Sequence, residues 1–367
     1  MKIVFTGGGT AGHLFPILAV IRELRNVYPG TDLKIYYAGP KNKHGEVLLS
    51  QENVKVVNIL CGKIRRYQSF KNIPDALKVP LGIIQSIFWL FFTAPDVVFS
   101  KGGYGSFPMA LAAGFLRIPF ILQESDIAPG LASKITSKWA LEIFTSFPDT
   151  ENFPKHKTIC LGNPIRMSLL NGNKEEAKKL FSLSQRPLLL ILGGSQGSQT
   201  INQLIIEILP DILNKFEIIH QTGIANQKQI QAEADIVLTK EQKVYYHSFA
   251  FLNEKQLKNA LSASDLVISR AGSGAIFEIA SAGKPMVLIP LMGSAQDHQA
   301  KNAYKMSDLG CGEVIEEQNL KPHLFTQRIK ALFDSPEALA AMAENSKIFS
   351  RPKATTIIAN YLNEYLT

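Results

Sequence analysis

A histidine directly follows a run of glycines near the start of the chain. Residues 7–12 read GGGTAG after the apolar run Ile3 to Phe5, and His13 comes next. Glycines at the start of a helix let backbone N–H groups approach a phosphate or a sugar. An imidazole with a pKa of about 6.5 can remove a hydroxyl proton at neutral pH. His13 is therefore a candidate general base, and the alternative is a capping or exposed histidine.

Further glycine loops follow other apolar runs. Residues 101–106 read KGGYGS, residues 193–198 read GGSQGS and residues 270–274 read RAGSG. The first could form a ligand surface or a plain tight turn. The second suits a diphosphate, although it has no lysine of the P-loop type, which disfavours NTP hydrolysis. The third leads into a helical pattern with Glu278, which could hold ribose hydroxyls or lie on a helix surface. The polar segment 123–126 (QESD) follows another apolar run and could bind a ligand or cap a helix.

Two common cofactor classes are disfavoured. GGGTAG formally fits a dinucleotide fingerprint, but the second predicted strand ends in Tyr37-Ala38-Gly39-Pro40, without the acidic residue that would bind ribose. No H-x-x-x-H pair and no Asp-x-Asp occurs, so no pattern of metal ligands is present. We predict no cofactor and no protein-bound metal. Negative charge on a ligand would then be met by helix amino ends and loop N–H groups.

The elements that position these loops alternate between strands and helices, which predicts parallel α/β sheets. The pattern occurs twice, and each series opens with a strand, a glycine loop and a helix. We therefore predict two Rossmann-like lobes facing a cleft, with ligands beyond the carboxyl ends of the strands. The strands predicted for the two series are 3–5, 34–38, 54–60, 96–100 and 118–122, then 188–192, 217–220, 243–247, 265–269 and 286–289.

Composition limits the partners. The net charge of +8 favours anionic partners, and the absence of a recognised module argues against nucleic acid. Three cysteines, far apart in the chain, favour a reducing compartment, and the start of the chain has no secretory pattern.

One long apolar stretch runs from Val79 to Phe92. It is shorter than the roughly 20 residues that span a bilayer, and polar or helix-breaking residues interrupt it, so we predict no transmembrane helix. Basic residues precede or interrupt the stretch, which suits an anionic membrane surface, whereas the alternative is a buried helix. These basic residues are Lys63, Arg65, Arg66, Lys71 and Lys78.

Seven motifs together resemble the MurG family of bacterial N-acetylglucosaminyl transferases, which make lipid II from lipid I, and the resemblance covers nearly the whole chain. The motifs are GGGTAGHLFP, KGGYGSFP, QESDIAPGL, GNPIR, GGSQGSQTIN, SRAGSGAIFEI and DHQAKNA. The resemblance implies a glycosyltransferase-B fold and an inverting, metal-independent hexosyl transfer. It implies an acceptor and membrane domain at 1–163, a UDP-sugar domain at 164–345, and a final helix at 346–367 that packs back on the first domain.

The resemblance also implies roles for individual residues. His13 matches the family's candidate base, and Glu278 would hold the ribose. The expected contacts to UDP-N-acetylglucosamine are Thr10, Ala11, Gly12, Asp126, Arg166, Ser195, Leu252, Ser273, Gly274, Ala275, Ile276, Phe277, Glu278 and Gln299. The expected contacts to the acceptor, undecaprenyl-linked lipid I, are Gly103, Tyr104, Gly105 and Glu124.

The family further implies a peripheral enzyme at the cytoplasmic face of the inner membrane, with cell-wall synthesis proteins as partners. Two residues depart from the family pattern: Ala11 stands where glycine is common, and Gln123 where many members have histidine. The alternatives are a related enzyme that glycosylates diacylglycerol, a UDP-N-acetylglucosamine 2-epimerase of the same fold, and a non-enzymatic membrane scaffold.

Overall fold

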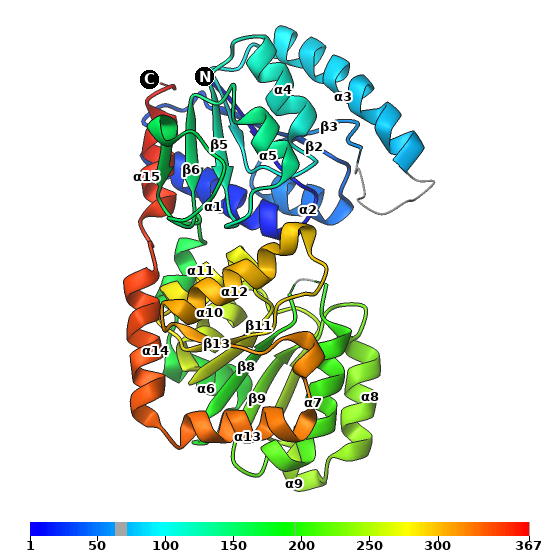
Figure 1. Cartoon of the computed structure of the whole chain (residues 1–367), viewed down its shortest axis with the longest axis vertical. Helices are drawn as coiled ribbons and strands as arrows, with labels where there is room; N and C mark the ends of the chain where they lie inside the picture. The colour runs from blue at the N-terminus through cyan, green and yellow to red at the C-terminus, as the bar shows by residue number, and fades with distance from the viewer. Residues whose placement is uncertain (63–71, 195, 367) are drawn as a thin grey trace. The chain divides into compact units, whose positions relative to one another are not determined.

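The chain forms two compact units (Figure 1). The computed structural model describes residues 1–62, 72–194 and 196–366. The first lobe comprises Met1–Arg166 and Pro352–Thr367, and the second lobe comprises Met167–Arg351. The domain boundary expected after residue 345 would cut helix α14 (Pro336–Phe349), which packs against α11 and α13 of the second lobe. The whole helix therefore stays with the lobe that supplies its packing partners.

The first lobe is built on a seven-stranded parallel sheet in the order β3-β2-β1-β4-β5-β6-β7. Its central strands are runs of valine, isoleucine and phenylalanine buried on both faces, as expected for a parallel sheet covered by helices. Strands β6 and β7 were not predicted from the sequence. The strands are β1 (Lys2–Thr6), β2 (Lys34–Gly39), β3 (Lys55–Asn58), β4 (Val97–Ser100), β5 (Phe120–Glu124), β6 (Glu142–Thr145) and β7 (Thr158–Cys160).

Helices cover both faces of this sheet and create two cores. One core joins the side chains of Ile3 and Phe5 to helices α1 and α15, and the other joins Val4 to α3 and α4. Side chains along β1 thus alternate between the two cores, as the period of a strand requires. The helices are α1 (Ala11–Val27), α2 (Lys43–Gln51), α3 (Asn72–Thr93), α4 (Phe107–Phe115), α5 (Leu131–Thr136), η1 (Lys155–Lys157) and α15 (Ala354–Asn363).

The second lobe has a six-stranded parallel sheet in the order β10-β9-β8-β11-β12-β13, which repeats the strand order of the first lobe. Two all-parallel sheets of this kind confirm the predicted pair of Rossmann-like lobes. The strands are β8 (Leu188–Leu192), β9 (Glu217–Gln221), β10 (Tyr246–Phe249), β11 (Leu266–Ser269), β12 (Met286–Leu288) and β13 (Gly312–Val314). The helices are η2 (Met167–Asn171), α6 (Lys174–Phe181), α7 (Gln199–Ile212), α8 (Gln227–Val237), α9 (Lys240–Lys243), α10 (Glu254–Ala263), α11 (Ser273–Ser281), η3 (Ala295–Asp297), α12 (His298–Asp308), η4 (Glu317–Asn319), α13 (Pro322–Phe333) and α14.

One predicted strand began too early. The sequence predicted a strand at 243–247, but β10 begins at Tyr246 because a short helix, α9, occupies Lys240–Lys243. A capping box starts this helix: the side chain of Thr239 accepts from the backbone of Gln242, and the side chain of Gln242 accepts from the backbone of Thr239. This local capping outweighs the strand preference of the neighbouring residues.

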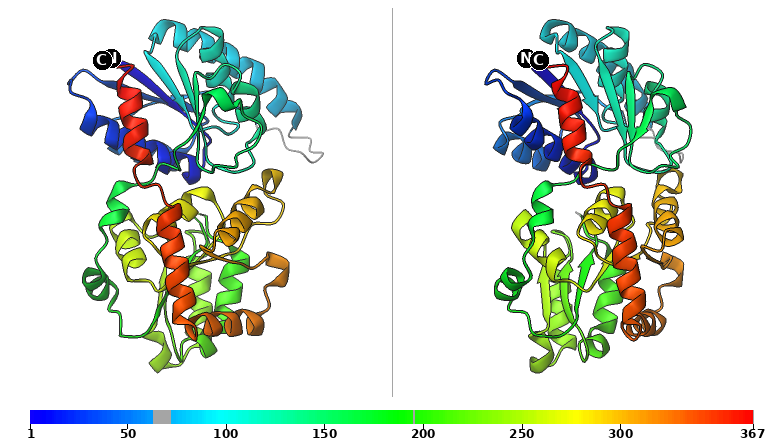
Figure 2. Two further views of the ribbon diagram at one scale, coloured as in Figure 1. Left: turned by 60° about the vertical axis from the view of Figure 1, so that its left-hand side comes forward. Right: turned by 90° about the vertical axis from the view of Figure 1, so that its left-hand side faces the viewer.

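The chain returns to the first lobe at its end, where α15 lies beside α1 in both views of Figure 2. The hydroxyl of Thr355 accepts from the backbone N–H of Ile165 at 3.0 Å and donates to the carbonyl of the same residue at 2.9 Å. The hydroxyl of Thr356 donates to the carboxylate of Glu23 on α1 at 2.6 Å. These bonds and the buried side chains of Ile358 and Leu362 attach α15 to the first lobe.

Helix α3 is longer than the apolar stretch seen in the sequence. It runs for 22 residues, and within the described part of the chain it is the one helix long and apolar enough to cross a membrane, judged by length and composition only. One face of α3 packs on α4, and at Gly82 a side chain would lie only 1.8 Å from the carbonyl oxygen of Leu60. The other face exposes a stripe of six apolar side chains: Leu77, Leu81, Ile84, Phe88, Phe91 and Phe92.

Candidate active site

In each lobe, two glycine loops lie together at the point where the strand order reverses. Strand β1 is flanked by β2 and β4, and β8 is flanked by β9 and β11, so successive connections leave in opposite directions. Open α/β sheets bind their ligands at such switch points. The loops at 7–10 and 101–106 follow β1 and β4, and the loops at 193–198 and 270–272 follow β8 and β11. The structure therefore brings together the loops that the sequence singled out, within each lobe.

Two polar side chains hold the carbonyl groups of the first glycine loop. The hydroxyl of Tyr37 lies 3.3 Å from the carbonyl oxygens of both Gly7 and Gly8, and the side-chain amide of Asn42 donates to the carbonyl of Gly9 at 2.8 Å. In a trans peptide the next N–H points the opposite way. The N–H groups of residues 8, 9 and 10 are therefore turned away from these two side chains, as an anion site requires.

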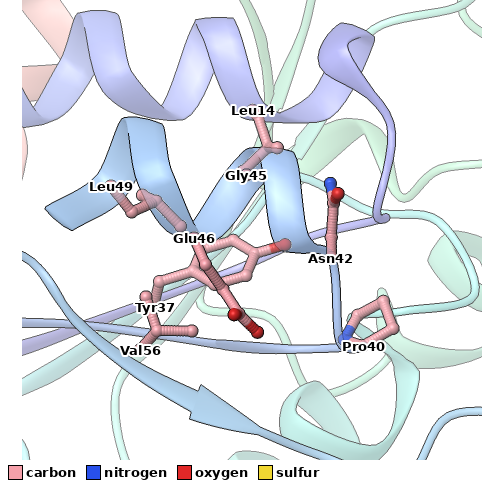
Figure 3. Close-up of a pocket in the computed structure, with 8 residues that line it drawn as sticks. All are labelled: Leu14, Tyr37, Pro40, Asn42, Gly45, Glu46, Leu49 and Val56. Carbon is pink, nitrogen blue, oxygen red and sulfur yellow. The ribbon is translucent and has the colours of Figure 1, made fainter.

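Sequence reasoning missed Tyr37 and Asn42, since nothing local marks them as loop supports. Figure 3 shows both side chains beside a small pocket between α1, α2 and β2. Burial raises the pKa of Tyr37, so its hydroxyl stays a donor at neutral pH. The residues that line this pocket are Leu14, Tyr37, Pro40, Asn42, Gly45, Glu46, Leu49 and Val56.

His13 connects the two glycine loops of the first lobe. Its Nδ1 lies 3.2 Å from the carbonyl oxygen of Lys101. A carbonyl only accepts, so Nδ1 carries a proton and, in the neutral ring, Nε2 carries the lone pair. A side chain at Gly8 would come within 2.6 Å of the ring, and one at Gly103 within 2.9 Å. These two positions are therefore glycine because the imidazole lies against them.

The segment after β5 places a buried carboxylate beside these loops. Glu124 is buried, and its Oε1 accepts from the backbone N–H groups of Ser125 at 2.9 Å and Asp126 at 3.3 Å. Burial, together with the charge of Asp126, raises the pKa of Glu124. Gln123 is also buried, and its amide donates to the hydroxyl of Ser146 at 3.0 Å. This departure from the family pattern is thus an interior residue that supports the strand end.

The remaining predicted residues of the first lobe lie around the same edge. Thr10 is exposed at the start of α1, and Tyr104 is exposed in the second loop. Gly105 lies so close to the first loop that a side chain there would come within 2.5 Å of the Gly7 carbonyl. Arg166 is buried, with its guanidinium 4.3 Å from the ring centre of Phe15 on α1. Ala11 and Gly12 begin helix α1.

In the second lobe, Gln221 at the end of β9 joins two predicted donor segments. Its amide donates to the carbonyl of Gly194 at 3.1 Å, and its oxygen accepts from the backbone N–H of Leu252 at 3.0 Å. The side chain of Leu252 is fully buried, so while this bond is kept only its carbonyl can meet a ligand. Ser195, another predicted donor contact, lies outside the described residues.

Helix α11 presents one open face at its start. A side chain at Gly272 or Gly274 would meet no protein atom within 4 Å, so the fold itself does not require glycine there. Gly274, Ala275 and Glu278 lie on the partly exposed face. The predicted contacts at Ser273, Ile276 and Phe277 have buried side chains, and the ring of Phe277 packs 4.9 Å from that of Phe349. Ile276 and Phe277 can therefore reach a ligand only through their backbone.

Arg270 links the loops that follow β8, β12 and β13. Its guanidinium donates to the hydroxyl of Ser198 at 2.7 Å and to the carbonyl of Ile289 at 3.2 Å, and it also pairs with Glu317. Ser198 in turn caps helix α7. Gln299 lies in the first turn of α12, and its side-chain oxygen accepts from the N–H of Leu291 at 2.9 Å. Sequence reasoning missed Arg270, because its partners come from distant parts of the chain.

Among residues 1–62, 72–194 and 196–366, no group of three or more His, Cys, Asp or Glu side chains could hold a metal ion. The groups that can meet negative charge at these sites are backbone N–H groups at the starts of α1, α7 and α11, together with Arg166 and Arg270.

Family models match both lobes. Residues 3–145 match the glycosyltransferase family 28 N-terminal domain, and residues 188–357 match the glycosyltransferase family 28 C-terminal domain. Among solved structures, the chain is similar to Acinetobacter baumannii MurG, with 25% identity, a TM-score of 0.75 and 99% of each chain covered. A UDP-GlcNAc 2-epimerase from Neisseria meningitidis shares the fold, with a TM-score of 0.68 at 19% identity over 99% of this chain and 100% of that one.

Two curated relatives carry the same name, UDP-N-acetylglucosamine–N-acetylmuramyl-(pentapeptide) pyrophosphoryl-undecaprenol N-acetylglucosamine transferase. The one from Treponema denticola is 36% identical, covering 100% of this chain and 98% of the relative. The one from Clostridium tetani is 35% identical, covering 94% and 93%. This level of identity over the full length, with both domain models matched in order, shows that the chain belongs to glycosyltransferase family 28, among the relatives of that name.

Proposed function

We propose that this chain transfers N-acetylglucosamine from UDP-N-acetylglucosamine to undecaprenyl-pyrophosphoryl-MurNAc-pentapeptide (lipid I), forming lipid II for peptidoglycan. The observation that carries the proposal is the 36% identity with the Treponema denticola transferase over the whole chain. The two glycine loops at the switch point of each lobe support it, because each lobe then offers backbone N–H groups to a diphosphate.

The donor is proposed to bind mainly to the second lobe. The starts of α7 and α11 offer N–H groups to the UDP diphosphate, and the carboxylate of Glu278, on the partly exposed face of α11, accepts from the ribose hydroxyls. The other donor contacts proposed for the second lobe are Gln299, the carbonyl of Leu252, and Ser195. From the first lobe we assign Thr10, Ala11, Gly12, Asp126 and Arg166 to the donor, and Gly103, Tyr104, Gly105 and Glu124 to the acceptor.

The transfer is a single displacement that inverts the anomeric carbon. The oxygen of the acceptor's 4-hydroxyl forms a bond to C1 of N-acetylglucosamine, while the bond from C1 to the phosphate oxygen breaks and UDP leaves with the electron pair. Nε2 of His13 takes the hydroxyl proton, because the bond from Nδ1 to the Lys101 carbonyl leaves the lone pair on Nε2. Backbone N–H groups stabilise the charge on the departing UDP.

The exposed stripe of α3 is the proposed membrane surface. The first five of its six apolar side chains recur every three or four residues, and Phe92 lies four residues after Phe88, so all six share one side of the helix. The opposite face is packed on the lobe, and α3 connects β3 to β4 of the sheet, so the helix cannot cross a membrane without leaving the lobe. We therefore propose that α3 lies on the lipid surface. The basic residues 63–71 expected to assist it lie outside the described residues, and Lys78 pairs with Asp75.

We place the enzyme at the cytoplasmic face of the plasma membrane, where its three cysteines, which form no disulfide, would stay reduced and where cell-wall synthesis proteins are candidate partners.

The function is tested by incubating the protein with labelled UDP-N-acetylglucosamine and lipid I in detergent with a chelator. Labelled lipid II is expected, and its formation in chelator argues against an essential divalent ion. Labelled diacylglycerol formed from a diacylglycerol acceptor, or UDP-N-acetylmannosamine formed without any acceptor, with no lipid II, would overturn the assignment and identify the alternative.

A further inference from the structure

A fully buried lysine lies in the first lobe's site, and its side chain has no role in the mechanism above, which uses only its backbone carbonyl. Lys101 directly follows β4 and is only 1% exposed. Buried lysines are rare, because removing an ammonium from water is costly unless partners compensate. The ammonium of Lys101 donates to the side-chain oxygen of Asn163 at 3.1 Å and to the hydroxyl of Ser125. A lysine in such a place therefore needs a reason beyond packing.

The hydroxyl partner of Lys101 lies in the segment after β5, which carries one residue assigned to the acceptor, Glu124, and one assigned to the donor, Asp126. Ser125 lies between the two carboxylates Glu124 and Asp126, and both attract the ammonium. Asn163 also accepts from the hydroxyl of Ser125 at 3.1 Å, so the lysine, the serine and the asparagine form a closed triangle of hydrogen bonds. The lysine thus connects the segment after β5 to the loop after β7.

The backbone of the same residue holds the proposed base. The Lys101 carbonyl accepts from Nδ1 of His13 at 3.2 Å. Directly after it, Gly102 and Gly103 have φ values of 69° and 80°, a region that favours glycine. Since the side chain of Lys101 is anchored at its far end, the carbonyl and the start of the 102–105 loop are fixed as well.

We propose that Lys101 is a positioning residue for the transfer: its buried ammonium balances the carboxylates of Glu124 and Asp126, and its backbone fixes the ring of His13. This inference rests on the proposed function and deepens it. The expected occupant of the surface so formed is the sugar–diphosphate part of the acceptor. A plain packing role would need only the apolar stem of the lysine, which methionine supplies.

The test is a double-mutant cycle of K101M, D126N and the two combined. K101M is expected to lower kcat about 10²-fold, because small displacements of reacting groups have effects of that size. Its affinity for UDP, measured by calorimetry, should stay within about twofold of wild type, because the UDP contacts are proposed mainly for the second lobe. The effect of K101M should be at least about 5-fold smaller in the D126N background, where one of the opposing charges is already removed.

A matched control is K284M, since Lys284 is a largely buried lysine of the second lobe that donates to the carbonyls of Ser262 and Ser264. K284M should keep its kcat. The proposal is overturned if K101M folds and keeps the wild-type kcat, or if K101M loses UDP affinity by as large a factor as it loses kcat. It is also overturned if K101M lowers kcat by the same factor in the wild-type and D126N backgrounds. If K101M does not fold, a folded K101M/D126N supports the proposal and an unfolded one overturns it. Failure of wild type to make lipid II would instead overturn the proposed function.

Discussion

At the scale of single residues, the ring of His13 is hydrogen-bonded to the Lys101 carbonyl, and a side chain at Gly8 or Gly103 would clash with it. A base held in one tautomer and one orientation is ready to accept the hydroxyl proton. We expect His13→Ala to lower kcat about 10²- to 10⁴-fold, the usual effect of removing a general base. The affinity for UDP should be unchanged in calorimetry. His323→Ala, at an exposed histidine of the second lobe, is the control, and comparable kcat values for the two variants would contradict the role of His13.

A second histidine should affect stability rather than activity. The side chain of Asn202 donates to the Thr222 carbonyl, so its oxygen accepts from Nε2 of the buried His220 at 3.0 Å, and Nδ1 then accepts from the hydroxyl of Tyr246 at 2.9 Å. Burial lowers the pKa of His220 to about 3. Between pH 3 and the ordinary pKa of about 6.5, the unfolded chain binds a proton that the folded chain does not, so stability falls as pH falls through this window.

The resulting prediction concerns the change in stability between pH 8 and pH 5. At pH 5 the proton taken up by unfolded His220 should lower the free energy of unfolding of wild type by about 2 kcal/mol. This is the difference of about 1.5 pH units between pH 5 and the ordinary pKa of about 6.5, at about 1.4 kcal/mol each. In the variant His220→Gln the side chain at this position does not titrate. Its free energy of unfolding, measured in urea, should therefore fall by about 2 kcal/mol less than that of wild type between pH 8 and pH 5. His156→Gln, at an exposed histidine, should behave like wild type. An equal pH dependence of wild type and His220→Gln would show that His220 does not titrate in this way.

At the scale of elements, local sequence patterns predicted the glycine loops. The side chains that hold these loops come from residues distant in the sequence, and local patterns did not predict them. The glycine loops and His13 are readable because glycine, helix start and histidine are adjacent in the sequence. Four other side chains form hydrogen bonds to segments far away in the sequence, and their partners depend on which strands become neighbours. They are those of Tyr37, Lys101, Gln221 and Arg270. Without the order of the strands, a buried lysine and a buried glutamine look like ordinary polar residues, so sequence reasoning could not assign them.

The stripe of α3 leads to a prediction at the same scale. Replacing Phe88, Phe91 and Phe92 together by serine removes three side chains that are 62%, 67% and 79% exposed, so the lobe should keep its fold. Burial of a phenylalanine in lipid is worth on the order of 1.5–3 kcal/mol when complete. The triple variant should therefore bind phosphatidylglycerol vesicles at least about 10-fold more weakly in a sedimentation assay.

The control for this experiment is the pair Ile236→Ser and Ile348→Ser in the second lobe, at isoleucines that are 83% and 73% exposed. These changes remove exposed apolar surface from helices α8 and α14, away from the α3 stripe, and should leave vesicle binding unchanged. If both variants lose binding equally, general hydrophobicity rather than the α3 stripe attaches the protein to lipid.

At the scale of the whole molecule, each lobe has its own core, and two spectroscopic signals can follow the unfolding of the two lobes separately. Both tryptophans, Trp89 and Trp139, belong to the first lobe, so tryptophan fluorescence follows that lobe alone, whereas far-ultraviolet circular dichroism follows both. Leu362 on α15 is buried in the core of the first lobe, and Leu209 on α7 is buried in the core of the second.

Truncating a buried leucine to alanine typically costs about 2–5 kcal/mol. Leu362→Ala should therefore shift the fluorescence transition in urea to lower concentration, although residue 362 is far in sequence from the strands of the first lobe. Leu209→Ala should shift part of the circular dichroism transition and leave the fluorescence transition in place. If both variants shift both signals equally, the two lobes unfold as one cooperative unit, and the separation of their cores has no thermodynamic consequence.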